Sequence, residues 1–368
     1  MMLGKIIGWE QGERLVRYIQ DGDIVDKSDT MCAIPSNKLE IKIGRKTFVY
    51  PVDNMEKDEY GRNDVFQISG KGEITKVYSS KNQEVDIFIT NKCNSNCVMC
   101  PLPENVRRKN QLQQSSWIKN YIRVLPEEIG YINITGGEPT LAREDLFEIL
   151  LLLKEKYQHS GYQLLTNGRS VSDKNFLQQL LQYIPTGIRF AIPLHSAIES
   201  IHDGITNAIG SFRQTDQGIK NLLYCGQKVE IRIVVSSKNV DTMEETAHYI
   251  RKHYQGIFCV NFIGMEMMGN AAVYKEQLWI DYEEAFKRMK KAVDILIRSG
   301  IDVQLYNFPL CAVDKGYWYL AVKSITEHKI RYMEECSSCS VKNICGGFFV
   351  STKKIMKPEV KPIIEEYK

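Results

Sequence analysis

The sequence predicts an α/β protein built around a partial (β/α)6 barrel of the TIM type. A small N-terminal β-rich domain precedes the barrel and a cysteine-rich extension follows it. Three observations predict this fold: alternating polar and apolar residues fill the first 82 positions, short apolar runs then alternate with longer amphipathic segments, and seven of ten cysteines fall into two groups. We expect domains at 1–82, 83–300 and 301–368.

The first 82 residues show the alternation of strands that bury one face. Leu39–Ile43 and Thr47–Tyr50 carry this pattern most clearly. Turn-forming residues separate such stretches, at Pro35–Asn37, Asp53–Asn54 and Gly61–Asn63. Short strands between turn signals predict a small β-rich domain.

From residue 85 the pattern changes to that of strands alternating with helices. The expected strands are Val85–Thr90, Tyr131–Thr135, Tyr162–Thr166, Ile188–Leu194, Val229–Val235 and Phe258–Ile263. The expected helices are Glu144–Lys156, Asp173–Tyr183, Thr242–His253 and Tyr282–Ser299, and a further strand is expected at Asp302–Tyr306. Right-handed crossovers between parallel strands would curl such a sheet into a full or partial barrel.

Composition excludes several classes of protein. The 48 Lys and Arg nearly balance the 45 Asp and Glu, for a net charge of +3, which argues against a nucleic-acid partner. We expect no membrane partner and no secretory signal, because no apolar run approaches the length of a membrane span and Met1–Lys5 lacks a signal's features. A cytoplasmic location is therefore expected. Reducing conditions would keep the cysteines free for metal or redox chemistry.

Three cysteines lie within eight residues directly after the first expected barrel strand. They are Cys93, Cys97 and Cys100. In a parallel barrel this position is the C-terminal rim, where ligands and catalytic groups collect. Three thiolates can hold three irons of a 4Fe–4S cluster and leave the fourth iron open to a small molecule. A zinc site lacking its fourth ligand is the alternative.

A second motif, Gly136-Gly137-Glu138-Pro139, follows the second expected strand. Paired glycines let backbone groups approach a ligand closely, and a carboxylate can accept hydrogen bonds from an ammonium group. Taken alone, such a run is also typical of an ordinary turn.

Together the two motifs resemble the radical S-adenosylmethionine (SAM) superfamily, over about residues 85–310. The cysteine spacing Cys-x3-Cys-x2-Cys, with bulky Met99 before the third cysteine, and the Gly-Gly-Glu-Pro run carry the resemblance. It implies a cluster on the three cysteines whose open iron binds SAM. It also implies that Met99 contacts adenine, and that Gly136, Gly137, Glu138 and Pro139 meet the ammonium of the methionine moiety.

Four further residues are candidates at the same rim. Asn167 follows the third strand and could bind SAM or substrate, or form a plain turn. His195 and Ser196 follow the fourth strand, where the family often places polar contacts to SAM. His195 is a candidate catalytic residue, or else a capping or surface histidine. Arg232 lies within the fifth strand, where it needs a partner, either the SAM carboxylate or a protein carboxylate.

The second cysteine group comprises Cys311, Cys336, Cys339 and Cys345. Four thiolates form a closed ligand set for a second 4Fe–4S cluster or a structural zinc ion. The resemblance favours iron, because radical SAM enzymes with twitch or SPASM extensions end in such a module. Four cysteines rather than seven or more imply one auxiliary cluster, as in the twitch form. The remaining cysteines, Cys32, Cys225 and Cys259, are expected to be buried small hydrophobic residues.

Within the superfamily, several strings resemble the radical SAM maturases of His-Xaa-Ser peptide systems. They are Ile192–Leu194 with His202-Asp203, Gly264–Glu266 with Gly269, Tyr306–Cys311 and Cys345–Phe349. The resemblance implies reductive cleavage of SAM to a 5′-deoxyadenosyl radical and a cross-linked or oxidised side chain in a ribosomally synthesised peptide. It implies as partners a precursor peptide, an external electron donor of flavodoxin or ferredoxin type, and a second maturase as a candidate.

Three alternative functions stay open at this point. The chain could act on a nucleotide or small metabolite, as molybdenum-cofactor cyclases do, or resemble sulfatase maturases. It could also be a binding protein with structural zinc and no turnover. The N-terminal domain could hold the peptide at an exposed sheet edge or serve as a stabilising cap.

Overall fold

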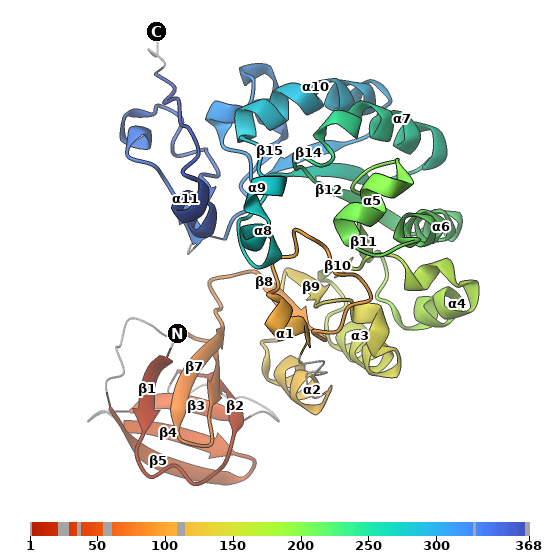
Figure 1. Cartoon of the computed structure of the whole chain (residues 1–368). Helices are drawn as coiled ribbons and strands as arrows, with labels where there is room; N and C mark the ends of the chain where they lie inside the picture. Colours follow the sequence, from red (N-terminus) through yellow and green to blue (C-terminus); the bar gives the residue numbers. More distant parts are fainter. Residues whose placement is uncertain are drawn as a thin grey trace.

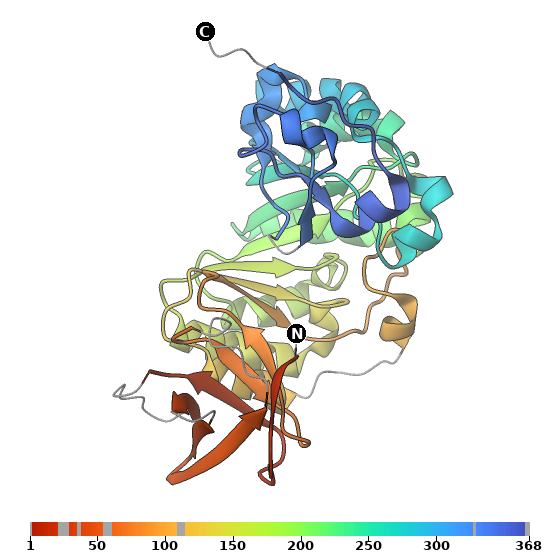
Figure 2. The same ribbon diagram turned by 90° about the vertical axis from the view of Figure 1, so that its left-hand side faces the viewer.

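The computed structural model of the chain describes residues 2–20, 29–34, 38–53, 61–108, 115–326 and 329–364. The N-terminal strands form a unit at one end of the molecule, and the C-terminal segment lies toward the other (Figure 2). Between them a curled sheet is covered by helices on its outer face (Figure 1). The predicted α/β class, with a partial barrel and a β-rich N-terminal part, is confirmed.

Seven strands close into a barrel at the N-terminus, in the order β1-β5-β4-β3-β2-β6-β7. They are β1 (Met2–Ile6), β2 (Arg14–Tyr18), β3 (Thr30–Ile34), β4 (Lys38–Ile43), β5 (Lys46–Asp53), β6 (Val65–Ile68) and β7 (Glu73–Tyr78). The two predicted stretches lie in β4 and β5, which pair antiparallel. Closure leaves no free edge among the described strands, so the peptide-holding edge considered above has no counterpart there.

The structure describes only some of the turns expected in the N-terminal domain. Pro35–Asn37 lies outside the described residues, as does Asn54. Asn63 has a φ of 70°, as a turn residue of this type tolerates.

The N-terminal barrel packs against the central part of the chain. Leu15, Val65 and Tyr78 belong to the same buried cluster as the central sheet. The hydroxyl of Tyr121, on α2 (Ser115–Val124), donates to the carbonyl of Val77 at 3.1 Å. These contacts are what a stabilising cap requires.

Eight parallel strands in sequence order form the central sheet. They are β8 (Glu84–Phe88), β9 (Tyr131–Thr135), β10 (Gly161–Leu165), β11 (Arg189–Pro193), β12 (Lys228–Val234), β13 (Cys259–Ile263), β14 (Val303–Tyr306) and β15 (Ala321–Val322). All six predicted barrel strands and the further strand at Asp302–Tyr306 are present. The sheet continues past residue 300, because β15 pairs with β14 at Leu305–Ala321. The domain limits themselves stay predictions.

The helices follow the predicted order. The described helices are α1 (Glu104–Arg108), α2, α3 (Glu144–Lys156), α4 (Lys174–Tyr183), α5 (Glu199–Thr206), α6 (Ser211–Tyr224), α7 (Met243–His253), α8 (Asn270–Val273), α9 (Lys275–Leu278), α10 (Tyr282–Arg298) and α11 (Val350–Met356). The bounds of the four predicted helices agree with the structure to within one residue; these helices are α3, α4, α7 and α10. The other described helices were not named from the sequence; α6, the longest of them, was missed because its polar first turns and Gly218 weaken the helical pattern. Gly218 is needed: a Cβ there would lie 2.1 Å from the Gly168 carbonyl oxygen.

The two faces of the central sheet differ in chemistry. On β12 the alternate residues Val229, Ile231 and Ile233 are buried in the apolar cluster that the outer helices share. Glu230 and Arg232 point to the opposite, inner face, as strand alternation requires. The apolar core around the central sheet therefore lies between sheet and helices rather than inside the curl, and the N-terminal barrel has a separate apolar cluster.

The C-terminal segment carries little regular structure. Strands β16 (Ile330–Arg331) and β17 (Phe348–Phe349) pair antiparallel, and α11 follows directly. None of the helices in the described ranges combines the length and the apolar character that crossing a membrane would require.

Candidate functional site

The first cysteine group lies on a loop that follows β8, and neighbouring elements hold this loop by its backbone. The end of α5 accepts two of its hydrogen bonds, from Asn96 N–H to the Thr206 carbonyl at 3.0 Å and from Val98 N–H to the Ile205 carbonyl at 2.9 Å. Backbone bonds of this kind fix the loop's course without using its thiols.

Two further side chains brace the same loop. Arg169, just beyond β10, donates to the carbonyl of Asn94 and to Ser95 Oγ. Arg107, on α1, donates to Asn96 Oδ1 at 2.6 Å. The loop is thus held from three separate parts of the fold.

Asn270, at the start of α8, clamps the loop from a fourth direction. Its Nδ2 donates to the Cys97 carbonyl at 2.8 Å, and its backbone N–H donates to the Cys100 carbonyl at 2.9 Å. The preceding Gly269 has a φ of 59°, and a Cβ there would lie 2.5 Å from the carbonyl oxygens of Cys100 and Pro101. From the sequence, Gly269 was named only within a family string, and Asn270 was missed. The Gly-Asn pair soon after a barrel strand was the available signal.

The three thiols are partly buried and close enough to influence one another. Burial, together with the neighbouring thiols, raises the pKa of Cys93 to about 11 and that of Cys97 to about 12. In the protein alone Cys93 and Cys97 are therefore neutral thiols. A bound cation would reverse this preference, because a coordinating thiol is deprotonated outright.

The spacing of these thiols is not that of a single-ion site. Among the described residues, no three His, Cys, Asp or Glu side chains are gathered closely enough to hold one metal ion. In a four-iron cluster each thiolate binds a different iron, so the ligands stand farther apart than around one ion. Three partly buried thiols on one braced loop fit the cluster.

Gly136 and Gly137 allow two backbones to meet at the ends of β8 and β9. Gly137 N–H donates to the Thr90 carbonyl at 2.6 Å, and Glu138 N–H donates to the Lys92 carbonyl at 2.7 Å. A Cβ at position 136 would lie 2.4 Å from the Thr90 oxygen, and one at position 137 would lie 2.3 Å from the Lys92 oxygen. The close approach that the sequence predicts is made here to the stem of the cysteine loop.

The Glu138 carboxylate is fully buried and accepts four hydrogen bonds from the protein. They come from the Thr140 N–H (3.1 Å), the Thr140 hydroxyl (2.6 Å), the Thr166 hydroxyl (2.7 Å) and the Asn167 N–H (2.6 Å). Burial nevertheless raises the pKa of Glu138. The carboxylate ties the end of β9 to the end of β10. Pro139 is buried and begins the 3-10 turn Pro139–Ala142.

Asn167 and Met99 also have protein partners. The Asn167 Nδ2 donates to Asn94 Oδ1 at 2.6 Å, so this amide links the end of β10 to the cysteine loop. Met99 is 7% exposed and packs in a cluster with Ile205, Met265 and Met267.

His195 and Ser196 follow β11 and are both buried. The His195 backbone N–H donates to His202 Nδ1 at 3.2 Å, and its own Nδ1 has no partner in the part of the chain that the structure describes. Burial lowers the pKa of His195 well below its ordinary value, so the ring is neutral. Burial excludes a surface histidine. The Ser196 hydroxyl lies 3.0 Å from the Thr242 hydroxyl and accepts the Ile198 N–H.

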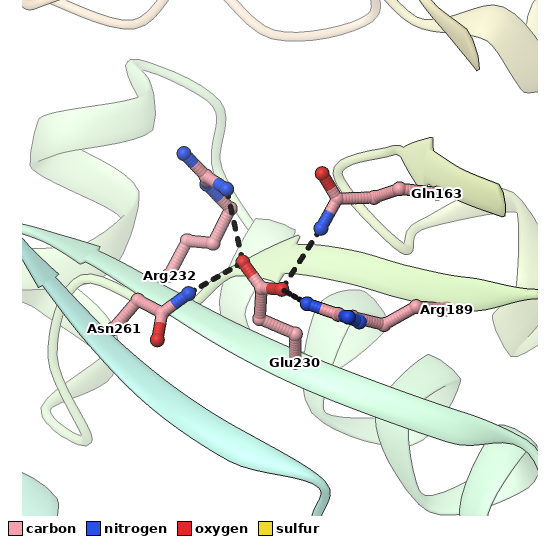
Figure 3. A network of polar contacts seen from close by, with 5 residues as sticks. All are labelled: Gln163, Arg189, Glu230, Arg232 and Asn261. Atoms are coloured by element: carbon pink, nitrogen blue, oxygen red, sulfur yellow. Dashed lines mark hydrogen bonds and ion pairs between the residues drawn. The ribbon is translucent and has the colours of Figure 1, made fainter. Parts of the chain in front are cut away.

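Arg232 has a protein carboxylate as its partner. Its Nη1 lies 2.9 Å from Glu230 Oε1, on the inner face of the sheet (Figure 3). Of the two partners that the sequence allowed, the structure contains this one. Glu230 itself was not singled out by sequence, because a lone Glu in a strand carries no distinctive spacing.

The second cysteine group converges on one pocket. Cys311, Cys336, Cys339 and Cys345 all line it, together with residues such as Leu310 and Tyr332. Burial, together with the neighbouring Cys345, raises the pKa of Cys311 to about 11. The Cys345 sulfur accepts the backbone N–H groups of Leu310 and Gly347, each at 3.4 Å.

The three remaining cysteines have different environments. Cys259 is buried as expected, whereas Cys225 is exposed, so the expectation for Cys225 was wrong. Cys225 caps the C-terminus of α6, where the chain turns outward. The side chain of Cys32 lies outside the described residues.

Comparison with known proteins agrees with this geometry. Residues 87–250 match the sequence model of the Radical SAM superfamily. The mycofactocin maturase MftC of Mycolicibacterium smegmatis is 25% identical over 215 residues, covering 58% of this chain and 51% of the relative. The antilisterial bacteriocin subtilosin biosynthesis protein AlbA of Bacillus subtilis is 26% identical over 175 residues, covering 48% and 38%.

The crystal structure of Streptococcus suis SuiB bound to precursor peptide SuiA shows a similar fold. It aligns with a TM-score of 0.50 at 14% identity, covering 61% of this chain and 48% of SuiB. The chain spans about half the length, or less, of these relatives.

Residues 87–250 of this chain therefore resemble a radical SAM domain. A domain of that kind implies a 4Fe–4S cluster and SAM as cofactors.

Replacing Asn270 with alanine should loosen the cysteine loop. The Cys97 carbonyl would lose its side-chain donor, at a cost of about 1–2 kcal/mol. After reconstitution with iron and sulfide, we expect iron to be lost to a chelator about 5–30 times faster than from the wild type. Asn133→Ala, which removes a bond to Asp86 at 3.0 Å away from the loop, is the control. Equal rates for both variants would contradict the clamp.

Stability should depend on pH through His202. Burial lowers the pKa of His202 to about 4, whereas the unfolded chain titrates near 6.5. Between these values the unfolded state binds the proton that the folded state excludes, so stability is lost as pH falls. His202→Asn retains an acceptor for the His195 N–H. Between pH 7 and 5 this variant should lose about 2 kcal/mol less unfolding free energy than the wild type, by urea unfolding. Equal losses of unfolding free energy in the variant and the wild type would contradict this role of His202.

Proposed function

We propose that this chain is a radical SAM enzyme that reductively cleaves SAM and cross-links or oxidises a side chain of a ribosomally synthesised peptide, as a maturase of the His-Xaa-Ser type. One observation carries the proposal: Cys93, Cys97 and Cys100 share a loop at the carboxyl end of β8 that four other elements brace. The names of relatives support a peptide substrate, since they include a mycofactocin maturase and a bacteriocin biosynthesis protein.

In this proposal Cys93, Cys97 and Cys100 hold the 4Fe–4S cluster. When bound, the cluster supplies an open iron for SAM and the electron that starts the reaction. The protein's own work is to fix the three thiols, to keep them partly buried and to shape the space beside them.

Gly136–Pro139 and Asn167 contribute to that work. Because four protein donors already occupy the Glu138 carboxylate, we assign it a positioning role: it holds the ends of β9 and β10 in register beside the cysteine loop. The Gly137 N–H is held by the Thr90 carbonyl, so the backbone carbonyls of Gly136 and Gly137 are the groups that we assign to the ammonium of the methionine moiety. Met99 would contact adenine at the edge of the cysteine loop. Ser196 would stabilise the turn after β11.

The second cysteine group would hold one auxiliary 4Fe–4S cluster. Four thiols line one pocket, and backbone N–H groups reach the Cys345 sulfur, as a thiolate ligand requires. A four-cysteine zinc ion is the alternative that the sequence left open, although the described residues contain no group of three such ligands placed to hold a single ion. The external electron donor, the second maturase and the cytoplasmic location stay predictions from the sequence.

Single substitutions should distinguish the functions of the two cysteine groups. Anaerobically reconstituted wild-type protein should hold roughly 8 irons per chain and release 5′-deoxyadenosine when reduced with SAM. Cys97→Ala should retain roughly 4 irons and lose SAM cleavage. Cys345→Ala, the matched control, should also retain roughly 4 irons but still cleave SAM. An iron assay measures the iron content of each variant, and chromatography of 5′-deoxyadenosine measures SAM cleavage. Zinc in place of iron, with no SAM cleavage, would overturn the proposed function.

The peptide substrate can be sought directly. Anaerobic incubation with peptides encoded by short open reading frames beside the gene should convert one of them to a product lighter by two hydrogen atoms. High-resolution mass spectrometry detects this change, and Cys97→Ala protein is the control. If wild-type protein cleaves SAM but instead transforms a nucleotide or metabolite in the same assay, the peptide assignment is wrong while the radical SAM assignment stands.

A further inference from the structure

A polar network occupies the inner face of the sheet, where a closed barrel would carry branched apolar side chains. Its members are Gln163, Arg189, Glu230, Arg232 and Asn261, from the four adjacent strands β10 to β13 (Figure 3). The register pairs Gln163 with Arg189 and Arg232 with Asn261, so their side chains share one face.

Glu230 is the centre of this network and is fully buried. Its Oε1 accepts from Arg232 at 2.9 Å and from Asn261 at 2.7 Å. Its Oε2 accepts from Gln163 at 2.8 Å and from Arg189 at 3.1 Å. Four donors satisfy the carboxylate completely. Two guanidinium groups against one carboxylate leave the network with one surplus positive charge.

The two arginine side chains are about equally exposed, at 25% for Arg189 and 23% for Arg232, but they differ in the rings beside them and in their places along the strands. The Arg189 guanidinium is covered by the rings of Phe258 and Tyr131, at 4.7 and 6.0 Å from their centroids. Arg232 has one ring beside it, that of Tyr306 at 5.5 Å, and lies toward the carboxyl end of β12, whereas Arg189 is the first residue of β11. A guanidinium carries five N–H donors. Within the described ranges, Glu230 is the one acceptor of the Arg232 side chain.

Asn261 presents an acceptor without a donor. Its side chain is fully buried, and its Nδ2 must face Glu230 because a carboxylate can only accept. The Oδ1 is therefore turned away, and no donor reaches it among the described residues. Leaving a buried carbonyl oxygen unpaired costs free energy that a ligand N–H would recover.

We propose that Arg232 and Asn261 bind an acidic residue of the substrate peptide. The Arg232 guanidinium donates to its carboxylate, the Asn261 Oδ1 accepts a backbone N–H of the same residue, and the Tyr306 ring contacts its methylene groups. This inference rests on the proposed peptide-modifying function. It gives Glu230 and Gln163 positioning roles, since they set the direction of both binding side chains without touching the ligand.

The location separates this carboxylate site from SAM. The residues assigned to the cofactor lie beyond the ends of β8, β9 and β10. Arg232 and Asn261 each lie two residues before the ends of their strands, at Val234 and Ile263. The site therefore lies below the rim, inside the curl of the sheet.

Two small probes test the site without knowledge of the peptide: N-acetyl-L-glutamate N-methylamide and its neutral glutamine analogue. With the reconstituted full chain, the glutamate probe should bind about 10- to 100-fold more tightly, measured by calorimetry or ligand-observed NMR. Arg232→Gln should abolish this preference, and Arg232→Lys should retain part of it. Arg189→Lys, the control, keeps the charge of the network and changes only the arginine that donates to Glu230 Oε2, so it should leave the preference within about twofold.

Equal binding of both probes, or no binding of either, would overturn the inference. Displacement of the glutamate probe by SAM would also overturn it, because the carboxylate site would then belong to the cofactor. SAM cleavage without peptide is measured on the same preparations. If cleavage fails while the probe preference persists, the proposed function is wrong and the carboxylate site stands. If cleavage is intact and the preference is absent, the site alone is wrong.

Discussion

The close contact of two backbones at the carboxyl ends of β8 and β9 is the constraint on which the site depends. Gly136 and Gly137 lie so near Thr90 and Lys92 that any side chain at either glycine would overlap a carbonyl oxygen. This contact fixes where the cysteine loop leaves the sheet. Glu138 extends the same restraint to β10 through its buried carboxylate. Three thiols can then face one space although their loop has no regular structure.

The division of the sheet into an apolar outer face and a polar inner face explains how stability and binding coexist. Burial of Val229, Ile231 and Ile233 against the helices supplies hydrophobic free energy on one side. The other side is free to carry charge, provided that each charge is paired. Glu230 meets that condition with four donors, and the surplus charge of its two arginines is what a ligand can use.

Sequence patterns predicted elements best where periodicity and burial agree. Helix α3, with its run of apolar residues, begins and ends where expected. Strand β15 was missed because two residues give no alternation, and it forms only by pairing with β14. Cys225 was misplaced because local hydrophobicity does not reveal that the end of α6 faces solvent. The closure of the N-terminal strands into a barrel likewise depends on long-range pairing of β1 with β5 and β7.

The sequence by itself determined the resemblance to the radical SAM superfamily, the strand order of the central sheet and the two cysteine groups, because each depends on residue type and spacing along the chain. Tertiary structure alone decided the partners: that Asn270 clamps the cysteine loop, that Glu138 binds protein donors, and that Arg232 pairs with Glu230. These contacts join residues that are either far apart in sequence or on strands whose facing is set by the sheet. Their geometry follows from packing, which no local pattern encodes.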